Sequence, residues 1–228
     1  MGITERRERE REQLRQRILE AARDLLSEQG LAGLSMRAIA ERIEYSAATI
    51  YLYYKDKNEL IHGVVHAGFT VMQEYTRAEL AVLGETASAA EQYAAMGRAY
   101  ARFALENTAY FRVMFELPGA ARFEWEDCAA RDPSQPDGFE AVVEMVERAT
   151  AEGSMRVPDP RRAALIGWGL VHGLTSLYLS GNLVDRVTSN ESFMELVEEA
   201  MASLQATGGA SARRTKAGRR SRSAPATR

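Results

Sequence analysis

Apolar residues recur at helical spacing along most of the chain and predict a series of amphipathic helices. Leu14, Ile18 and Leu25 lie four and seven residues apart, and Gly30 marks the expected end of the first helix. Further helices are expected over 35–43, 47–53, 57–83, 88–106, 109–115, 139–153, 160–180 and 190–206. Since no segment alternates like a strand and no repeat of fixed period occurs, the predicted fold class is all-α.

Polar residues mark the expected starts of several of these helices. Ser35 precedes a short apolar pattern and is a good N-cap. Two other starts have the Ser/Asp-x-x-Glu spacing of a capping box, at 56–59 and 88–91. Asp159-Pro160 combines an N-cap with proline at the first helical position, which needs no backbone N–H donor.

Three segments lack this patterning. Residues 1–13 alternate Arg and Glu, so we expect a frayed end or a solvated helix extension. Residues 118–138 are rich in Pro, Gly and Asp and predict a long loop. Residues 207–228 form a basic, low-complexity tail that we expect to be disordered. The tail either adds phosphate attraction or acts as a solubilising end.

Composition excludes several classes of protein. The 228 residues are 46% hydrophobic and 27% charged, as in soluble globular proteins, and no apolar run is long enough to span a membrane. With Cys128 alone, no apolar leader and three histidines, we expect a reduced, cytoplasmic protein without a metal or other cofactor. His62 and His66 have metal-compatible spacing but do not complete a zinc site. No catalytic motif occurs, so an enzyme is not expected.

The formal net charge of −3 is unevenly distributed. Residues 1–60 are balanced, residues 61–204 carry a net charge of −10, and residues 205–228 carry +7. An acidic body repels polyanions, so a nucleic acid would have to meet one end of the chain.

Residues 35–54 have the pattern of a helix-turn-helix. Ala40 is small enough for two short helices to cross closely, and the apolar contact between them would be formed by Ile39, Ile43 and Ile50. The second helix begins with Ser46 and small side chains, and such an end can enter a DNA major groove about 12 Å wide.

Three motifs occur in order: a predicted helix ending in LLSEQG, then LSMRAIAERI, then TIYLYYKDKNEL. With these motifs, residues 14–62 resemble the TetR family of transcriptional regulators. Two positions depart from the family pattern. Glu44-Tyr45-Ser46 replaces the usual Gly-Val-Ser at the turn, where glutamate costs about 1 kcal/mol if φ is positive. Ala47 stands where the family often has a basic residue.

The candidate DNA contacts belong to three groups: side chains near the first short helix, small residues that open the second, and hydrogen-bonding groups that follow it. Tyr54 is expected in the core instead. The DNA-binding candidates are Ser35, Arg37, Ser46, Ala47, Ala48, Thr49, Tyr51, Tyr53, Lys55 and Lys57.

The C-terminal half contains Trp168 and His172 on one helical face, followed by Gly173. This W-x-x-x-H-G pattern resembles the ligand and dimerisation domain of one TetR subgroup. Small residues along 160–181 permit close helix approach, and 190–206 carries an apolar stripe. We therefore expect a homodimer through these two helices, with a packed monomer core as the alternative.

An apolar effector pocket is expected between helices of the body. His172 would orient the effector or gate it by protonation, or else be an ordinary buried histidine. The candidate lining residues, each of which could equally belong to the core, are Phe103, Tyr110, Phe111, Met114, Phe115, Met145, Trp168 and His172.

These patterns predict a helix-turn-helix DNA-binding domain over residues 1–56 and a helical ligand-binding and dimerisation domain over 57–206. The predicted function is that of a dimeric repressor that binds a palindromic double-stranded operator and is released by a small, largely apolar effector. The alternative is a ligand-binding helical adaptor that has lost operator recognition, because the turn at Glu44-Tyr45 is unusual.

Overall fold

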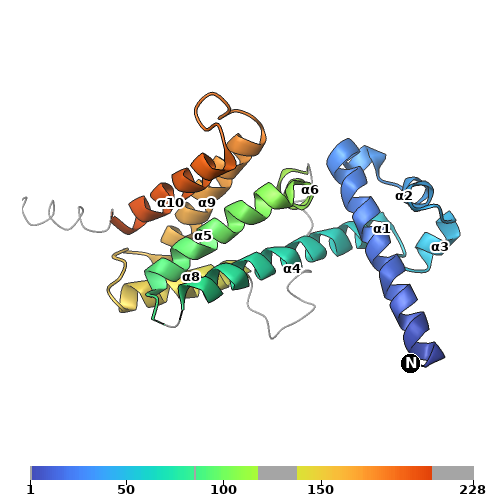
Figure 1. The fold of residues 1–228 in the computed structure, drawn as a ribbon, viewed down its shortest axis with the longest axis horizontal. Helices are drawn as coiled ribbons and strands as arrows, with labels where there is room; N and C mark the ends of the chain where they lie inside the picture. The colour runs from blue at the N-terminus through green and yellow to red at the C-terminus, as the bar shows by residue number, and fades with distance from the viewer. Residues whose placement is uncertain (1, 85, 118–137, 207–228) are drawn as a thin grey trace, which may run out of the picture. The chain divides into compact units, whose positions relative to one another are not determined.

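The computed structural model describes residues 2–84, 86–117 and 138–206, and every regular element in these ranges is a helix (Figure 1). Cys128 and the predicted basic tail lie outside them. The helices are α1 (Ile3–Gly33), α2 (Met36–Ile43), α3 (Ala47–Tyr51), α4 (Lys57–Leu83), α5 (Ala89–Glu106), α6 (Thr108–Phe111), η1 (Arg112–Glu116), α8 (Gly138–Ala151), α9 (Pro160–Leu179) and α10 (Asn190–Ala206).

The described residues form two compact units. Unit 1 takes the residues up to Glu74 and from Phe103 to Leu117, and unit 2 takes those from Tyr75 to Arg102 and from Gly138 onward. The units therefore share α4 and α5, and their division does not coincide with the predicted functional boundary at residues 56 and 57, which stays a prediction.

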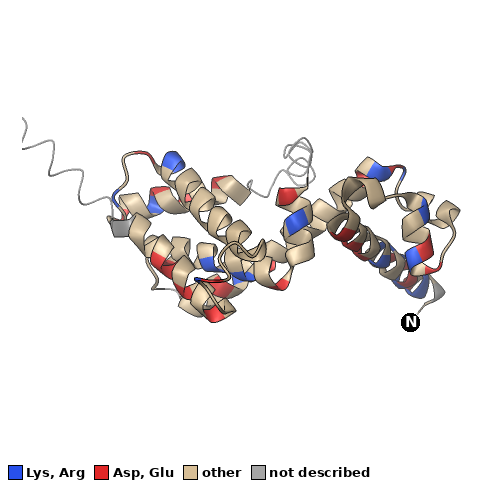
Figure 2. Cartoon of the chain, turned by 90° about the horizontal axis from the view of Figure 1, so that it is seen from above, with Lys and Arg blue, Asp and Glu red and all other residues tan. Residues whose placement is uncertain are grey.

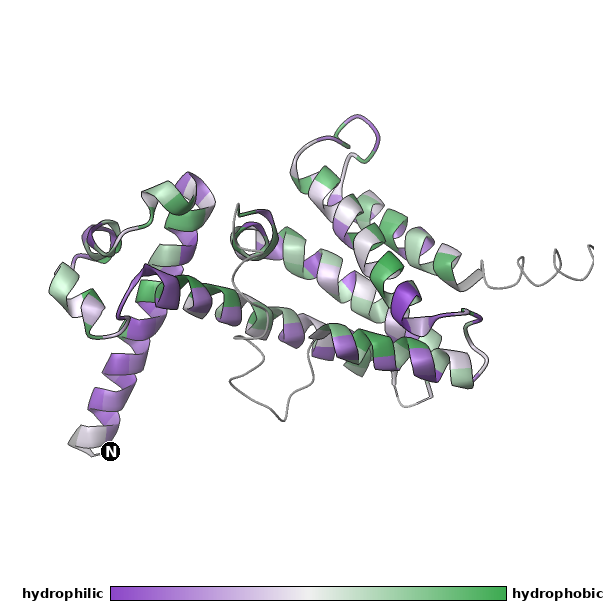
Figure 3. Ribbon diagram, turned by 180° about the vertical axis from the view of Figure 1, so that it is seen from behind, coloured by the Kyte–Doolittle hydropathy of each residue, from purple (hydrophilic) through white to green (hydrophobic). Residues whose placement is uncertain are grey.

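The first helix begins at Ile3, well before the apolar pattern starts at Leu14. Residues 3–13 therefore have the conformation of the solvated helix extension, one of the two expectations for this end of the chain. The extension has charges of both signs on its surface (Figure 2) and is hydrophilic over several turns (Figure 3). At the other end, Gly30 breaks the helical geometry with a φ of 65°, a conformation that favours glycine.

The apolar core of unit 1 joins the first four helices. Ile18, Ile39 and Ile50 come from α1, α2 and α3 and are fully buried, as is Leu60 at the start of α4. Tyr54 is buried too, and the Arg15 guanidinium carbon lies 5.2 Å from the centre of its ring. The predicted core role of Tyr54 is confirmed, and all three isoleucines expected between the two short helices, Ile39, Ile43 and Ile50, are buried.

The expected helix over 109–115 is in fact two elements, the short α6 and the five-residue π-helix η1. Met114 and Tyr110 approach Gly68 of α4 so closely that a Cβ at Gly68 would collide with the Met114 sulfur. Apolar spacing could not distinguish the two helix types, because either one places residues four apart, such as Phe111 and Phe115, close together.

Unit 2 packs α5, α8, α9 and α10 with the end of α4. Gly167 of α9 leaves room for the Tyr93 hydroxyl, and Gly97 of α5 lies against Met201 of α10. Burial raises the pKa of the Tyr93 phenol to about 12, because the charged form would lose its hydration. The mostly buried Glu79 carboxylate accepts from Arg98 at 3.3 Å and pairs with Arg102 at 2.8 Å.

Candidate nucleic-acid interface and effector site

A serine side chain caps the N-terminus of each short helix, α2 and α3, in the candidate DNA-binding segment. Ser35 Oγ accepts from the Ala38 N–H at 3.1 Å, and Ser46 Oγ accepts from the Thr49 N–H at 3.1 Å. The Ser46 and Thr49 hydroxyl oxygens are also 2.9 Å apart. The Ser35 cap predicted from the sequence is confirmed. The two interactions between Ser46 and Thr49 stabilise the first turn of α3.

The turn between α2 and α3 is built around Glu44, whose φ of 61° and ψ of 43° are left-handed. The Tyr45 N–H donates to the Ala40 carbonyl at 2.8 Å, which closes α2. Arg17 of α1 donates to the Ile43 carbonyl at 3.2 Å, and its guanidinium carbon lies 5.5 Å from the centre of the Tyr45 ring. The turn therefore forms as the family pattern requires, although glutamate occupies the glycine position.

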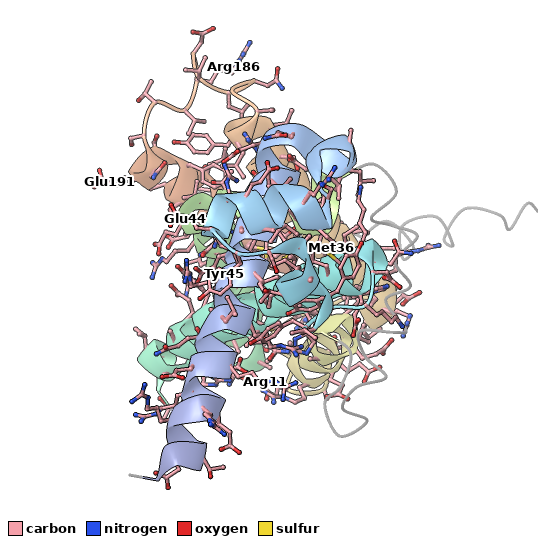
Figure 4. All side chains as sticks on the ribbon, turned by 90° about the vertical axis from the view of Figure 1, so that its right-hand side faces the viewer. Arg11, Met36, Glu44, Tyr45, Arg186 and Glu191 are labelled. Atoms are coloured by element: carbon pink, nitrogen blue, oxygen red, sulfur yellow. The ribbon has the colours of Figure 1, made fainter. Side chains whose placement is uncertain are left out.

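Most of the predicted DNA-contacting side chains are accessible. Tyr51 is 57% exposed although it belongs to the five-residue helix α3, and the half-buried ones are Ala47, Thr49, Tyr53 and Lys57. The exposed ones are Ser35, Arg37, Ser46, Ala48, Tyr51 and Lys55. Figure 4 looks onto this end of unit 1 and shows Glu44 and Tyr45 beside α1. Leu52, at 78% exposure, is a further accessible residue here that the sequence did not single out.

The start of α4 differs in part from expectation. Asp56 Oδ1 accepts from the Glu59 N–H at 2.8 Å, so the cap half of the predicted capping box is confirmed. Glu59 Oε2 accepts from the Lys55 N–H at 2.7 Å, one residue before the cap, where a full box would use the Asp56 N–H. Lys57 Nζ donates to the Leu31 carbonyl of α1. In this conformation Lys57 joins two helices of unit 1, a contact between residues too far apart in sequence for spacing to predict.

The predicted effector residues belong to two different units. Tyr110, Phe111 and Met114 of unit 1 are buried, as is Phe103, while Phe115 is half-buried. The Arg23 guanidinium carbon of α1 lies 5.0 Å from the centre of the Tyr110 ring. Burial disfavours the Arg23 charge, but the hydrogen bond and charge of Asp24, together with Tyr110, raise the pKa of Arg23.

The other three predicted effector residues lie in unit 2, where His172 and Trp168 join an aromatic cluster. Tyr100 Oη and His172 Nδ1 are 2.8 Å apart, so one donates a hydrogen bond to the other. Ring centres are separated by 6.1 Å between Trp168 and His172 and by 6.2 Å between Phe139 and Trp168. Met145 of α8 is half-buried. Sequence reasoning missed Tyr100 and Phe139, since neither shares a helix with His172.

The chain matches two described families of regulator. Residues 18–64 match "Bacterial regulatory proteins, tetR family", and residues 93–204 match "Tetracyclin repressor-like, C-terminal domain". This protein belongs to the TetR family. The resemblance predicted from the helix-turn-helix residues is thereby confirmed, whereas the W-x-x-x-H-G subgroup stays a prediction.

A relative from Haemophilus influenzae, described as an uncharacterized HTH-type transcriptional regulator, is 33% identical over 94 residues. The match covers 41% of this chain and about half, 49%, of that relative. Family and relative are regulators rather than enzymes, in agreement with the absence of catalytic motifs.

Solved structures share the fold of this TetR-family chain. A TetR-family regulatory protein from Rhodococcus RHA1 is 20% identical, with a TM-score of 0.65 over 83% of this chain and 96% of that one. The fatty acid degradation regulator FadR from Bacillus halodurans is 14% identical, with a TM-score of 0.66 over 84% of this chain and 94% of that one. At these identities the likeness shows the fold, which agrees with the predicted all-α class.

In this TetR-family protein, α9 has an apolar face turned away from its own unit. Leu165, Ile166 and Leu177 are about half exposed, and a Cβ added at Gly169 or Gly173 would meet no atom within 4 Å. The opposite face is buried. In contrast, α10 directs most of its predicted apolar stripe into unit 2, where Phe193, Val197 and Met201 are buried, while Leu196, Ala200 and Leu204 are half-buried.

Among the described residues, no helix has the combined length and apolarity that crossing a bilayer requires. Over the same ranges, no three His, Cys, Asp or Glu side chains gather as a metal site would need.

Proposed function

We propose that this TetR-family regulator is a homodimeric repressor that binds a palindromic operator and is released by a small, largely apolar effector. The observation that carries the proposal is the geometry of α3, a short capped helix with an exposed Tyr51 and small side chains at its N-terminal end. Such an end fits the major groove, where Thr49 and Ala48 meet base edges.

Around this helix, phosphate contacts would fix the position of the protein on DNA. The exposed Ser35 and Arg37 at the start of α2, and Tyr51 and Lys55 after the groove-facing residues, can donate hydrogen bonds to phosphate oxygens. Lys57 has a smaller role in the proposal than its charge suggests, because its ammonium group is bonded to the Leu31 carbonyl.

The exposed apolar face of α9 supports a dimer. Ile166, Gly169, Gly173 and Leu177 follow one another by three or four residues and so lie on one side of the helix. Glycines within such a face let a second helix approach closely, and the leucine and isoleucine side chains would leave water on association. A two-fold axis would then present two copies of α3 to half-sites about 34–36 Å apart.

For the effector site, we favour the aromatic cluster of unit 2. Trp168 is partly exposed, and the hydrogen bond between Tyr100 and His172 supplies a polar group among apolar rings. Apolar walls with few polar groups are typical of small-molecule sites. The predicted lining residues of unit 1 stay a prediction, and their burial equally suits an ordinary core. Because α4 contributes to both units, a shift of this helix would link effector binding to the DNA-binding segment.

A selection from a random duplex library, followed by fluorescence anisotropy at several salt concentrations, tests DNA binding. We expect Tyr51→Phe to weaken binding by about 3- to 10-fold on all selected sequences, because one hydrogen bond to phosphate is lost. Thr49→Ala should instead change which bases are preferred. The salt dependence should not change in either variant, since neither side chain is charged.

Tyr178→Phe in unit 2 is the matched control, because it also removes one phenol hydroxyl, which donates to Asn190. Its DNA affinity should equal that of the wild type. Failure of the wild-type protein to enrich any palindrome would overturn the proposal and favour the adaptor alternative.

A further inference from the structure

The helical extension at the start of α1 is outside the part of the chain that the TetR family match covers. The match begins at Ile18, the first fully buried residue of α1, whereas the helix begins at Ile3. About four turns of helix therefore precede the matched segment. From Thr4 to Gln13 every residue is exposed, so the packing of unit 1 does not account for the composition of this segment.

Three arginines of α1 are placed on one side of the helix. Arg7, Arg11 and Arg15 follow at intervals of four residues, and Ile18 continues the same side into the core. The arginine stripe is therefore on the side of α1 that faces the helix-turn-helix. Independent evidence for this orientation is the Arg15 guanidinium, which lies over the buried Tyr54 ring.

A shallow hollow lies between this arginine stripe and Tyr53, which follows α3 in the candidate DNA-binding segment. It is lined by Arg11 and Arg15 of α1, by Glu8 and Glu12 on the flank of the stripe, and by Tyr53. Figure 4 shows Arg11 on the part of α1 between the N-terminus and Tyr45. The hollow thus reaches from the predicted phosphate contact Tyr53 to Arg11, and Arg7 lies one turn of α1 beyond it.

The arginines of the extension differ in their partners. Arg6 is paired with Glu10 at 2.8 Å, whereas Arg7 and Arg11 form no ion pair with any residue that the structure describes. Four residues of helix rise by about 6 Å, so Arg7 and Arg11 lie on successive turns of α1 and can bind neighbouring phosphates of one DNA strand.

We propose that Arg7 and Arg11 bind backbone phosphates of duplex DNA beyond the bases reached by α3. This inference rests on the proposed DNA-binding function and extends it: each subunit contacts a longer stretch of DNA than its helix-turn-helix alone would cover. Glu8 and Glu12 limit the surface to the arginine stripe, because their carboxylates repel phosphates on that flank.

The test compares two double variants that lose the same charge. Arg7→Ala/Arg11→Ala removes the proposed contacts, and Arg6→Ala/Arg9→Ala removes two arginines from other sides of the same helix. Alanine favours helix, so the extension should stay folded in both, which far-ultraviolet circular dichroism would verify. The probe is the duplex that wild-type protein enriches from the random library, embedded in longer flanking DNA.

For Arg7→Ala/Arg11→Ala we expect the slope of log affinity against log salt to become less steep by about 0.9 per arginine and subunit. The hydroxyl-radical footprint should also shorten at its outer ends. Arg7→Lys/Arg11→Lys should restore both values, because lysine keeps the charge. The control double variant should retain most of the wild-type slope and the full footprint.

Two results would overturn the inference itself, and a third would overturn the proposed function on which it rests. Equal loss of slope in both alanine variants, with an unchanged footprint, would show general attraction by net charge and overturn the assigned contacts. A footprint no longer than the two half-sites in the wild type would do the same. If wild-type protein binds no duplex at all, it is the proposed function that fails.

Discussion

Glu44 occupies a left-handed backbone conformation that glycine would adopt more readily. The turn nevertheless closes with the Tyr45 and Arg17 hydrogen bonds intact. The strain, about 1–2 kcal/mol for a residue with a Cβ, is therefore borne by the native state.

Replacing Glu44 by glycine should raise stability. Relief of the strain exceeds the extra backbone entropy of glycine, so we expect a gain of about 0.5–1 kcal/mol and a rise in melting temperature of about 1–4 °C. Thermal unfolding monitored by circular dichroism measures it. Glu44→Ala removes the same charge but keeps the Cβ, and should change the melting temperature little. Equal shifts for the two variants would mean that charge, and not backbone conformation, matters at this turn.

At the scale of elements, caps and apolar spacing predicted most helix ends, because these signals are local in sequence. The capping box at Ser88 and the caps at Asp56 and Asp159 all form. The π-helix η1 and the Lys57–Leu31 bond could not be predicted, since they depend on helices that meet only in the folded chain. The same holds for the candidate sites: the accessible end of α3 was predicted, whereas Tyr100 beside His172 was not.

The crossing of α5 and α9 offers a test of close helix packing. In Gly167→Ala the new methyl group would collide with the Tyr93 hydroxyl and lie 2.9 Å from Tyr93 Cζ, so we expect a loss of about 1–3 kcal/mol in the free energy of unfolding. Urea denaturation measures it.

A double-mutant cycle identifies the cause. Tyr93→Phe alone loses only the long, 3.4 Å bond to the Ala163 carbonyl, and combined with Gly167→Ala it should recover much of the stability. Strictly additive losses would show that the collision with the hydroxyl is not the reason.

At the scale of the whole molecule, the apolar face of α9 is exposed to solvent in a single chain, and we propose that a second copy covers it. We expect the wild-type protein to sediment at about twice its chain mass of 25.3 kDa. Ile166→Glu should yield monomers, because it would place a charge in an interface that excludes water. Val184→Glu, at a residue 65% exposed in the segment between α9 and α10, is the matched control and should remain dimeric. A monomeric wild type at micromolar concentration would refute the predicted assembly.

Because α4 is one continuous helix, the number of residues between two of its contacts matters as much as their identity. Within unit 1, Lys57 at the start of α4 is bonded to α1, and Gly68 further along lies against Met114 and Tyr110. Inserting one amino acid between them would displace the second anchor by about 1.5 Å and rotate it by about 100°. Tags or insertions for engineering therefore belong in connecting segments, and never in the middle of this helix.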